Sequence, residues 1–337
     1  MRTRPVRTRL GWLLAAGALT LAAVTASIAV GTRPIPPATV WDALLHGGAT
    51  PDALVVRTLR VPRAAVGVTA GAALGLAGAA LQAITRNPLA DPGILGLSQG
   101  ASAGVVLAIV SGLAGGFNGY VWYAFGGAIA AACLVYLVAL RSRGGATPVK
   151  LALAGTALSA MVAGATSVLL TADSATLDQY RFWQVGSLSG RDSGTVTQML
   201  PFLAVGALIV VARARGLDAL LLGDETARAQ GHRVGLIRVT AALGAALLTA
   251  AAVAAAGPVA FVGLAAPHLA RRLARGSGGG YGFVLPLSAL LGASLLLAAD
   301  VAGRVVLAPA EVPAGVMTAL VGAPVLVALV RRRGVAG

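Results

Sequence analysis

The chain has 337 residues, of which 57% are hydrophobic and 11% are charged, and its formal net charge is +15. Soluble domains carry roughly 25% charged residues, so this composition excludes a soluble enzyme that merely carries a membrane tag. The apolar runs are long and lack the alternation that is typical of transmembrane β-barrels, so we expect an all-α polytopic membrane protein.

Ten apolar segments are candidates for transmembrane helices, within one transmembrane domain over residues 1–337. The third is short and Gly-rich, and the eighth is too short for the ~20 residues that a straight span needs. In chain order, the expected crossings are residues 10–30, 64–84, 93–111, 119–140, 149–171, 195–212, 236–256, 258–270, 283–303 and 312–330.

The first crossing follows an Arg-rich segment, residues 2–9, and so also has features of a cleavable signal peptide. Its apolar run of about 20 residues is longer than the apolar region of a signal peptide, and nine further crossings follow. We therefore expect an uncleaved first helix.

Positive charge predicts the orientation of the chain in the membrane. With the N-terminus inside, most basic residues fall on the cytoplasmic side; they include Arg2, Arg4, Arg143, Lys150, Arg331, Arg332 and Arg333. The positive-inside rule accounts for the net charge, so no nucleic-acid partner is expected. An even number of helices puts both termini in the cytoplasm.

Crossings two to five and seven to ten form two groups of four that enter the membrane in opposite directions. In each group the second member is short and marked by Pro or Gly, namely residues 93–111 and 258–270. This arrangement predicts an inverted repeat with a pathway near the interface of the two halves.

Residues 86–96, RNPLADPGILG, contain two prolines and two glycines, which exclude a continuous helix. At membrane depth such a break is tolerated only where protein or water satisfies the freed backbone groups, so it indicates a transport path or a packed helix junction. The candidate pathway and helix-break residues are Gln82, Asn87, Pro88, Asp91, Pro92, Gly93, Gly257, Pro258 and Pro267.

The longest cytoplasmic connection, residues 213–238, contains a segment that alternates apolar and charged residues at helical spacing, residues 217–231. Amphipathic helices of this kind lie on the bilayer or dock on a partner, and its acidic residues argue against anionic lipid. We favour a docking surface for a cytoplasmic subunit over a solvated connector. The candidate residues are Leu220, Gly223, Asp224, Glu225, Ala227 and Arg228.

Arg57, Arg60, Arg63 and Arg304 fall on the outer side, against the general charge trend. Such a cluster predicts an anionic partner, either an acidic ligand or carboxylates of an external protein, with lipid headgroups as the alternative. Asp300 is the only acid inside an expected crossing and lies four residues before Arg304, so we favour a structural ion pair over a proton relay.

Several kinds of chemistry lack their motifs in this chain. His46, His232 and His268 do not share metal-ligand spacing, and the single cysteine, Cys133, allows no disulfide within the chain. Lys150 is not part of a Gly-Lys-Ser/Thr motif, so the chain has no P-loop for ATP hydrolysis. We therefore expect neither an enzyme nor a bound cofactor or metal.

At the level of motifs, the chain resembles the inner-membrane permeases of binding-protein-dependent ABC importers for iron–siderophores, haem and vitamin B12. The matching positions cover nearly the whole chain: LRVPR at 59–63, residues 71–82, NPLADPGILG at 87–96, Gly100 and Ala101, LGDETAR at 222–228, GPVAFVGLAAPH at 257–268, Ala299, Asp300, Arg304, EVPAG at 311–315 and GAP at 322–324.

This resemblance implies ten helices per subunit, a dimer with a second copy or a paralogue, and a path at its two-fold interface. It also implies two cytoplasmic ATP-binding subunits, which hold the ATP and Mg, and an external substrate-binding protein. In such permeases, arginines that match Arg60, Arg63 and Arg304 receive acidic residues of the binding protein. The segment that matches residues 217–231 sits in a groove of the ATPase.

Residues 180–191, YRFWQVGSLSGR, look like the siderophore branch of the family. The resemblance therefore implies a ferric siderophore as substrate, with vitamin B12 or haem as the alternative within the family. An ion-coupled secondary transporter is the alternative from another class, and a structural membrane scaffold is a third.

Overall fold

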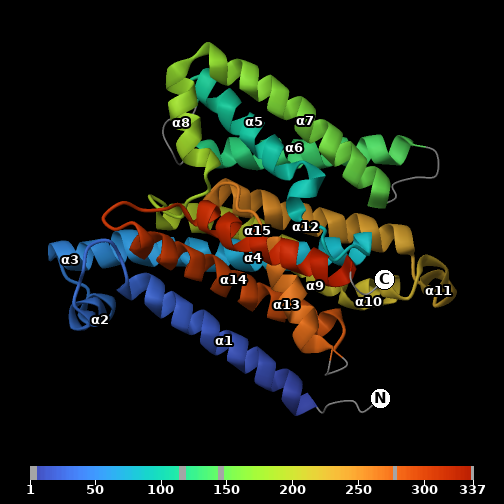
Figure 1. The fold of residues 1–337 in the computed structure, drawn as a ribbon, viewed down its shortest axis with the longest axis horizontal. Coiled ribbons are helices and arrows are strands. Elements are labelled where there is room, and N and C mark those ends of the chain that lie inside the picture. Colours follow the sequence, from blue (N-terminus) through green and yellow to red (C-terminus); the bar gives the residue numbers. More distant parts are fainter. Residues whose placement is uncertain (1–5, 114–118, 143–147, 276–278, 335–337) are drawn as a thin grey trace.

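The structure is a computed structural model that describes residues 6–113, 119–142, 148–275 and 279–334. Within these ranges all the regular structure is helical, which confirms the expected fold class (Figure 1). The ten longest helices are α1 (Val6–Ala29), α4 (Val61–Thr85), α5 (Leu97–Val110), α6 (Tyr120–Arg141), α7 (Pro148–Ala172), α9 (Ser193–Ala212), α12 (Val234–Ala256), α13 (Val262–Ala274), α14 (Tyr281–Val306) and α15 (Ala314–Gly334). Among the basic residues counted for orientation, Arg2, Arg4 and Arg143 lie outside the described residues, as do the side chains of Arg331, Arg332 and Arg333.

Each of the ten expected crossings overlaps one of these helices. In the part of the chain that is described, seven helical stretches are long and apolar enough to span a membrane: α1, α6, α7, α9, α12, α14 and the stretch Pro51–Thr85 that ends in α4. Helices α5 and α13 and the apolar part of α15, Ala314–Pro324, are shorter. The count of ten crossings therefore stays a prediction for these three.

The expected start of the eighth crossing at residue 258 is wrong, because α13 begins only at Val262. Gly257 has a φ of 75° and Phe261 a φ of 68°, so the backbone between them cannot continue α12 as a right-handed helix. The helix extends to Ala274, beyond the expected end at residue 270, so His268 lies inside α13.

Seven shorter helices occupy the connections between the long ones. They are α2 (Pro37–Leu45), α3 (Pro51–Leu54), the π-helix η1 (Val55–Arg60), the 3-10 helix η2 (Pro92–Leu95), α8 (Ser174–Gln184), α10 (Ala214–Leu221) and α11 (Asp224–Ala229). Several begin at a side-chain cap: Asp173 accepts hydrogen bonds from two backbone N–H groups of α8, Thr50 accepts one from Ala53 in α3, and Asp91 accepts one from Gly93 in η2.

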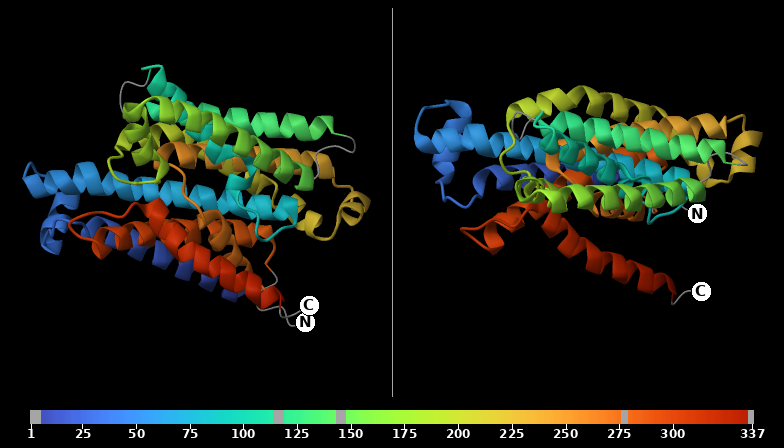
Figure 2. Two further views of the ribbon diagram at one scale, coloured as in Figure 1. Left: turned by 45° about the horizontal axis from the view of Figure 1, so that its top comes forward. Right: turned by 90° about the horizontal axis from the view of Figure 1, so that it is seen from above.

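Helices α4 and α12 form the centre of the molecule, and most of each is buried, whereas α1 and α7 lie at opposite edges (Figure 1). The two halves of the chain exchange contacts: α4 packs on α14, and α12 packs on α6. Within each half, α5 packs on α6 and α13 packs on α14. This reciprocal pattern is the one expected of an inverted repeat. Helix α15 lies at the edge of the bundle, and its C-terminal end points away from the other helices (Figure 2).

Glycines let the central helices approach at backbone distance. A Cβ atom added to Gly71 of α4 would lie 2.6 Å from the carbonyl oxygen of Gly292 in α14, and one added to Gly75 would overlap the carbonyl oxygen of Ser288. In lipid no hydrophobic effect drives helices together, so close packing of this kind is a main source of stability.

Candidate functional site

The first expected helix break and the helix that follows the second are joined by one buried amide, that of Gln82 in α4. Its Nε2 atom donates to the carbonyl oxygen of Ala90 in the first break (3.1 Å) and lies 3.4 Å from the carbonyl oxygens of Gly263 and Leu264 at the start of α13. Gly263 also packs directly on Pro92, because a Cβ added to it would lie 2.7 Å from the Pro92 Cδ atom. The first break is therefore packed against the helix that follows the second.

The first break, residues 86–96, is an ordered turn whose side chains satisfy its own backbone. Arg86 ends α4 in the left-handed conformation, with φ 51° and ψ 25°. The Asn87 side chain accepts a hydrogen bond from the backbone N–H of Leu89, and the Asp91 side chain accepts one from Gly93 (2.8 Å). These local bonds replace the helical ones that the prolines remove.

The second break, residues 257–261, is held by two other segments. A Cβ added to Gly257 would lie 2.6 Å from the carbonyl oxygen of Trp183 at the end of α8. The backbone N–H of Gly315, at the start of α15, donates to the carbonyl oxygen of Gly186 (2.9 Å). The end of α8, the second break and the start of α15 thus form one junction.

A cleft of about 470 Å³ opens where the two breaks face each other. It is lined by Asp91, Gly93 and Ser98 from the first half, Pro258, Val259 and Ala260 from the second break, and Gln184, Val185, Gly315, Val316 and Ala319 from the neighbouring segments. Of the residues predicted for the pathway, the structure therefore brings Asp91, Gly93 and Pro258 together, with Gln82, Pro92 and Gly257 packed behind them. Asn87, Pro88 and Pro267 do not line this cleft.

At the opposite end of α4, Arg60 and Arg304 bind the C-terminal end of α1. Arg60 donates to the carbonyl oxygens of Ile28 (2.9 Å), Ala29 (2.7 Å) and Arg33 (2.6 Å). Arg304 donates to those of Ser27 and Val30, both at 2.7 Å. The last carbonyls of a helix lack partners within it and carry partial negative charge, so two guanidinium groups stabilise this end.

Asp300 pairs with Arg304, as the four-residue spacing predicted, and both side chains are almost fully buried. The sequence did not show that Asp300 also binds Arg63 (2.8 Å), which in turn contacts Glu311 (2.8 Å). Arg60, Arg63 and Arg304 are therefore all satisfied within the chain, and their role in docking an external protein stays a prediction.

The cytoplasmic segment folds into two short helices, α10 and α11, separated at Gly223, whose φ is 107°. The structure thus confirms the expected break. Leu220 and Ala227 are buried against the body of the protein. Leu221, Leu222, Glu225 and Arg228 are exposed, so the segment presents a surface of mixed apolar and charged character.

Two acidic side chains of this segment bind it to the membrane helices. Asp224, at the start of α11, accepts hydrogen bonds from Arg86 at the end of α4 and from Arg238 of α12 (2.9 Å to the latter). Asp218 of α10 accepts one from the backbone N–H of Tyr281 (2.7 Å) and so caps α14. Burial raises the pKa of Asp218, although this hydrogen bond acts in the opposite direction.

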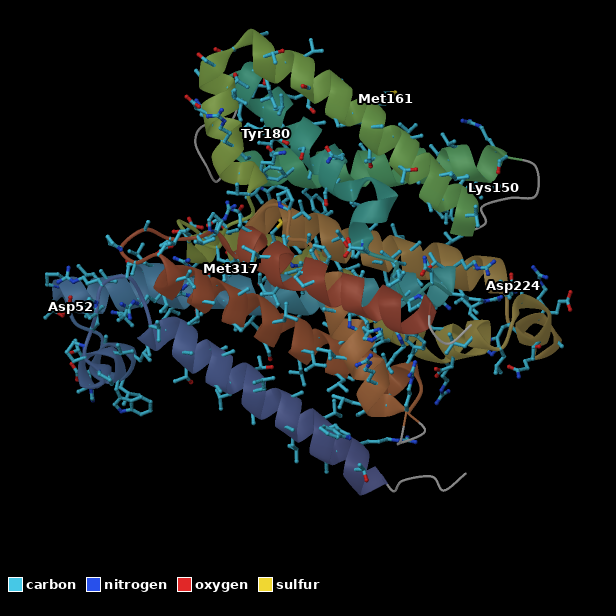
Figure 3. The ribbon with its side chains drawn as sticks, in the orientation of Figure 1. Asp52, Lys150, Met161, Tyr180, Asp224 and Met317 are labelled. Atoms are coloured by element: carbon cyan, nitrogen blue, oxygen red, sulfur yellow. The ribbon has the colours of Figure 1, made fainter. Side chains whose placement is uncertain are left out.

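Figure 3 shows Asp224 at one end of the long axis and Asp52, in α3, at the other.

The chain that carries this cleft and this segment is similar to known proteins over nearly its whole length. The model of the FecCD transport family matches residues 19–332. The chain belongs to this family. FepD of Escherichia coli strain K12, the permease protein of the ferric enterobactin transport system, is 40% identical over 316 residues, covering 94% of this chain and 93% of FepD.

The chain is also similar to a permease protein named for another substrate and to a solved transporter structure. BtuC of Halobacterium salinarum, a permease protein of a cobalamin import system, is 36% identical over 326 residues, covering 93% of this chain and 86% of BtuC. An inward-facing structure of an ABC transporter of the metal-chelate type superposes with a TM-score of 0.82 at 27% identity, covering 95% of this chain and 98% of the other. The chain is therefore a multi-pass membrane transport subunit and not an enzyme.

Proposed function

We propose that this chain is the permease subunit of an ABC importer that moves a ferric siderophore across the inner, cytoplasmic membrane. The observation that carries this proposal is the similarity to the ferric enterobactin permease, which extends over nearly the full length of both chains. The segment at residues 180–191, which resembles the siderophore branch, supports the same substrate class.

We infer an assembly of two permease subunits, either two copies or a copy and a paralogue. Two cytoplasmic ATP-binding subunits supply the ATP and Mg, and a substrate-binding protein docks outside. The segment within residues 213–238 contacts the ATPase. Its exposed Leu221, Leu222, Glu225 and Arg228 support this role, because they offer an apolar patch with a charged rim. Both termini are cytoplasmic in this arrangement.

The transport cycle follows from the two breaks. ATP binding moves the segment that contains α10 and α11, and the broken helices around the cleft then alternate between outward and inward access. The binding protein docks near Arg60, Arg63 and Arg304. Arg63 is the one of the three whose ion pair reaches a partly exposed acid, Glu311, so a carboxylate of the binding protein competes for it there.

Vitamin B12 is the second candidate substrate, and the similarity to the cobalamin import permease favours it over haem. Cells with and without this gene, grown under iron limitation, should be compared for uptake of labelled ferric siderophores and of labelled cobalamin. We expect loss of ferric siderophore uptake only. Loss of cobalamin uptake alone would keep the importer and overturn the substrate, and loss of neither would contradict both.

A further inference from the structure

Arg86 has an unusual conformation and unusual partners for a residue at the end of a helix. It adopts the left-handed conformation, which non-glycine residues rarely occupy, and it is exposed on the side of the chain that faces α10 and α11. Its position directly before Asn87 makes it the first residue of the break that leads to the cleft. Because no helical turn separates Arg86 from residues 87–96, a displacement of Arg86 acts directly on the break.

The Arg86 guanidinium bridges the two short helices on either side of Gly223. Its Nε atom donates to the carbonyl oxygen of Leu220 (2.9 Å), in the last turn of α10, and its Nη2 atom binds Asp224, the first residue of α11. A cation at a helix C-terminus and an acid at a helix N-terminus are both favourable to the helix dipoles. Gly223 separates α10 from α11, and Arg86 contacts the helix on each side of this break.

The same carboxylate binds the second half of the protein. Arg238, in the second turn of α12, donates to the Asp224 oxygen that also binds Arg86 (2.9 Å). Helix α4 leads into the first break at Arg86, and α12 ends at the second break at Gly257. Asp224 is therefore held by one arginine from each of the two helices that lead to the breaks lining the cleft.

We propose that Arg86, Asp224 and Arg238 form the link through which displacement of α10 and α11 opens and closes the cleft between the two breaks. This inference rests on the proposed function, and it names the positioning residues that transmit the motion of α10 and α11 to the cleft. Arginine reaches Leu220 and Asp224 with two different nitrogen atoms, whereas lysine has a single nitrogen at the end of its chain and cannot place donors at both positions. Arg86→Lys therefore keeps the charge and removes the bridge.

The test uses the complete complex of permease, ATPase and binding protein in vesicles. The parent carries Cys133→Ala, which removes the chain's single cysteine, and Ser98→Cys, which places a thiol at the cleft. The readout is the rate at which a thiol-specific reagent modifies residue 98, with and without ATP. We expect ATP to change this rate in the parent and in the control Arg141→Ala, an exposed arginine at the end of α6.

In Arg86→Lys and in Asp224→Asn we expect the ATP-dependent change to fall by about fivefold or more, the lower end of typical coupling between sites. In Arg86→Lys, which lies outside the residues assigned to the ATPase contact, ATP hydrolysis and the amount of assembled complex should stay close to those of the parent. A full ATP response at residue 98 in these variants overturns the proposal, as does the absence of any ATP response in the parent. Loss of the assembled complex in both variants also overturns it, because the three residues would then stabilise the assembly and not transmit motion.

Failure of the link and failure of the proposed function are separable. Uptake of ferric chelates from a panel of catecholates, hydroxamates and citrate is measured in the same vesicles. Transport by the parent with an unchanged response in Arg86→Lys refutes only the link. Absence of ATP-driven transport of every ferric chelate and of cobalamin, with the ATP response at residue 98 intact, refutes only the proposed function.

Discussion

Arg63, Asp300, Arg304 and Glu311 form a connected set of ion pairs, which we call the outer charge cluster. Replacing Asp300 by Asn tests whether this cluster stabilises the permease itself. Asp300 accepts hydrogen bonds from Arg63 and Arg304, and its side chain is only 1% exposed. Asn keeps the shape and one acceptor but leaves the two guanidinium groups facing each other, with only Glu311 as a counter-ion. Removal of one partner from a buried ion pair typically costs about 3–5 kcal/mol.

We expect Asp300→Asn to lose about 3 kcal/mol, which corresponds to a fall in Tm of roughly 6 °C at ~2 °C per kcal/mol. The assay is thermal unfolding of the isolated permease in detergent, followed by circular dichroism at one fixed scan rate. Adding Arg63→Gln removes one of the two opposed cations, so the double variant should lose less than the sum of the single losses, by about 1 kcal/mol or more.

Glu311→Gln is the matched control. It removes a charge from the same cluster at a partly exposed position, where an ion pair typically contributes about 0–1 kcal/mol. If Asp300→Asn leaves Tm unchanged but weakens binding of the external protein, the cluster serves docking and the structural interpretation is refuted. If Tm falls in the absence of any binding protein, the cluster is structural in its own right.

Four further predictions follow from the packing and the electrostatics. Gly75→Ala should lower Tm, because overpacking typically costs about 1–3 kcal/mol and the opposing atom belongs to the backbone of α14. The control is Gly164→Ala on α7, which should not lower Tm because nothing lies within 4 Å of the added Cβ atom. Equal effects of the two substitutions in thermal unfolding would contradict the packing account. Gln82→Met removes the amide that joins the first break to the start of α13 and should cost about 1–3 kcal/mol; an unchanged Tm would show that the hydrogen bonds are dispensable. Glu225→Lys should weaken binding of the ATPase in a pull-down from detergent, and full binding would exclude this exposed acid from the contact. Burial raises the pKa of Asp218 in the folded state, so the ionised carboxylate is disfavoured there. The stability of the wild type relative to Asp218→Asn should therefore fall as pH rises above about 4. A difference in Tm between the two proteins that stays constant from acid to neutral pH would contradict this.

The positions of the long helices were predictable because each depends on local hydropathy. The break at Gly223 was also predictable, because glycine supplies a positive φ at no steric cost. The start of α13 was not, since the residue that adopts the left-handed conformation there is Phe261, whose sequence gives no such signal. That conformation is therefore seen only in the folded chain.

The outer charge cluster shows the same division between local and distant contacts. The spacing of Asp300 and Arg304 on one helix predicted their ion pair. The capping of α1 by Arg60 and Arg304 was missed, because it joins residues far apart in the chain. Arg86 entered the sequence analysis only as the first residue of the break at 86–96, and its contacts with Leu220 and Asp224 became visible only in the folded chain.

The most direct test of the account is ATP-driven transport by the purified complex. The permease, its ATPase and its binding protein are reconstituted in vesicles, and uptake of labelled ferric siderophore is measured with ATP, without ATP and with cobalamin in its place. The account predicts ferric siderophore uptake that requires both ATP and the binding protein. Uptake of cobalamin alone would contradict the substrate, and uptake driven by an ion gradient without ATP would contradict the assignment to an ABC importer.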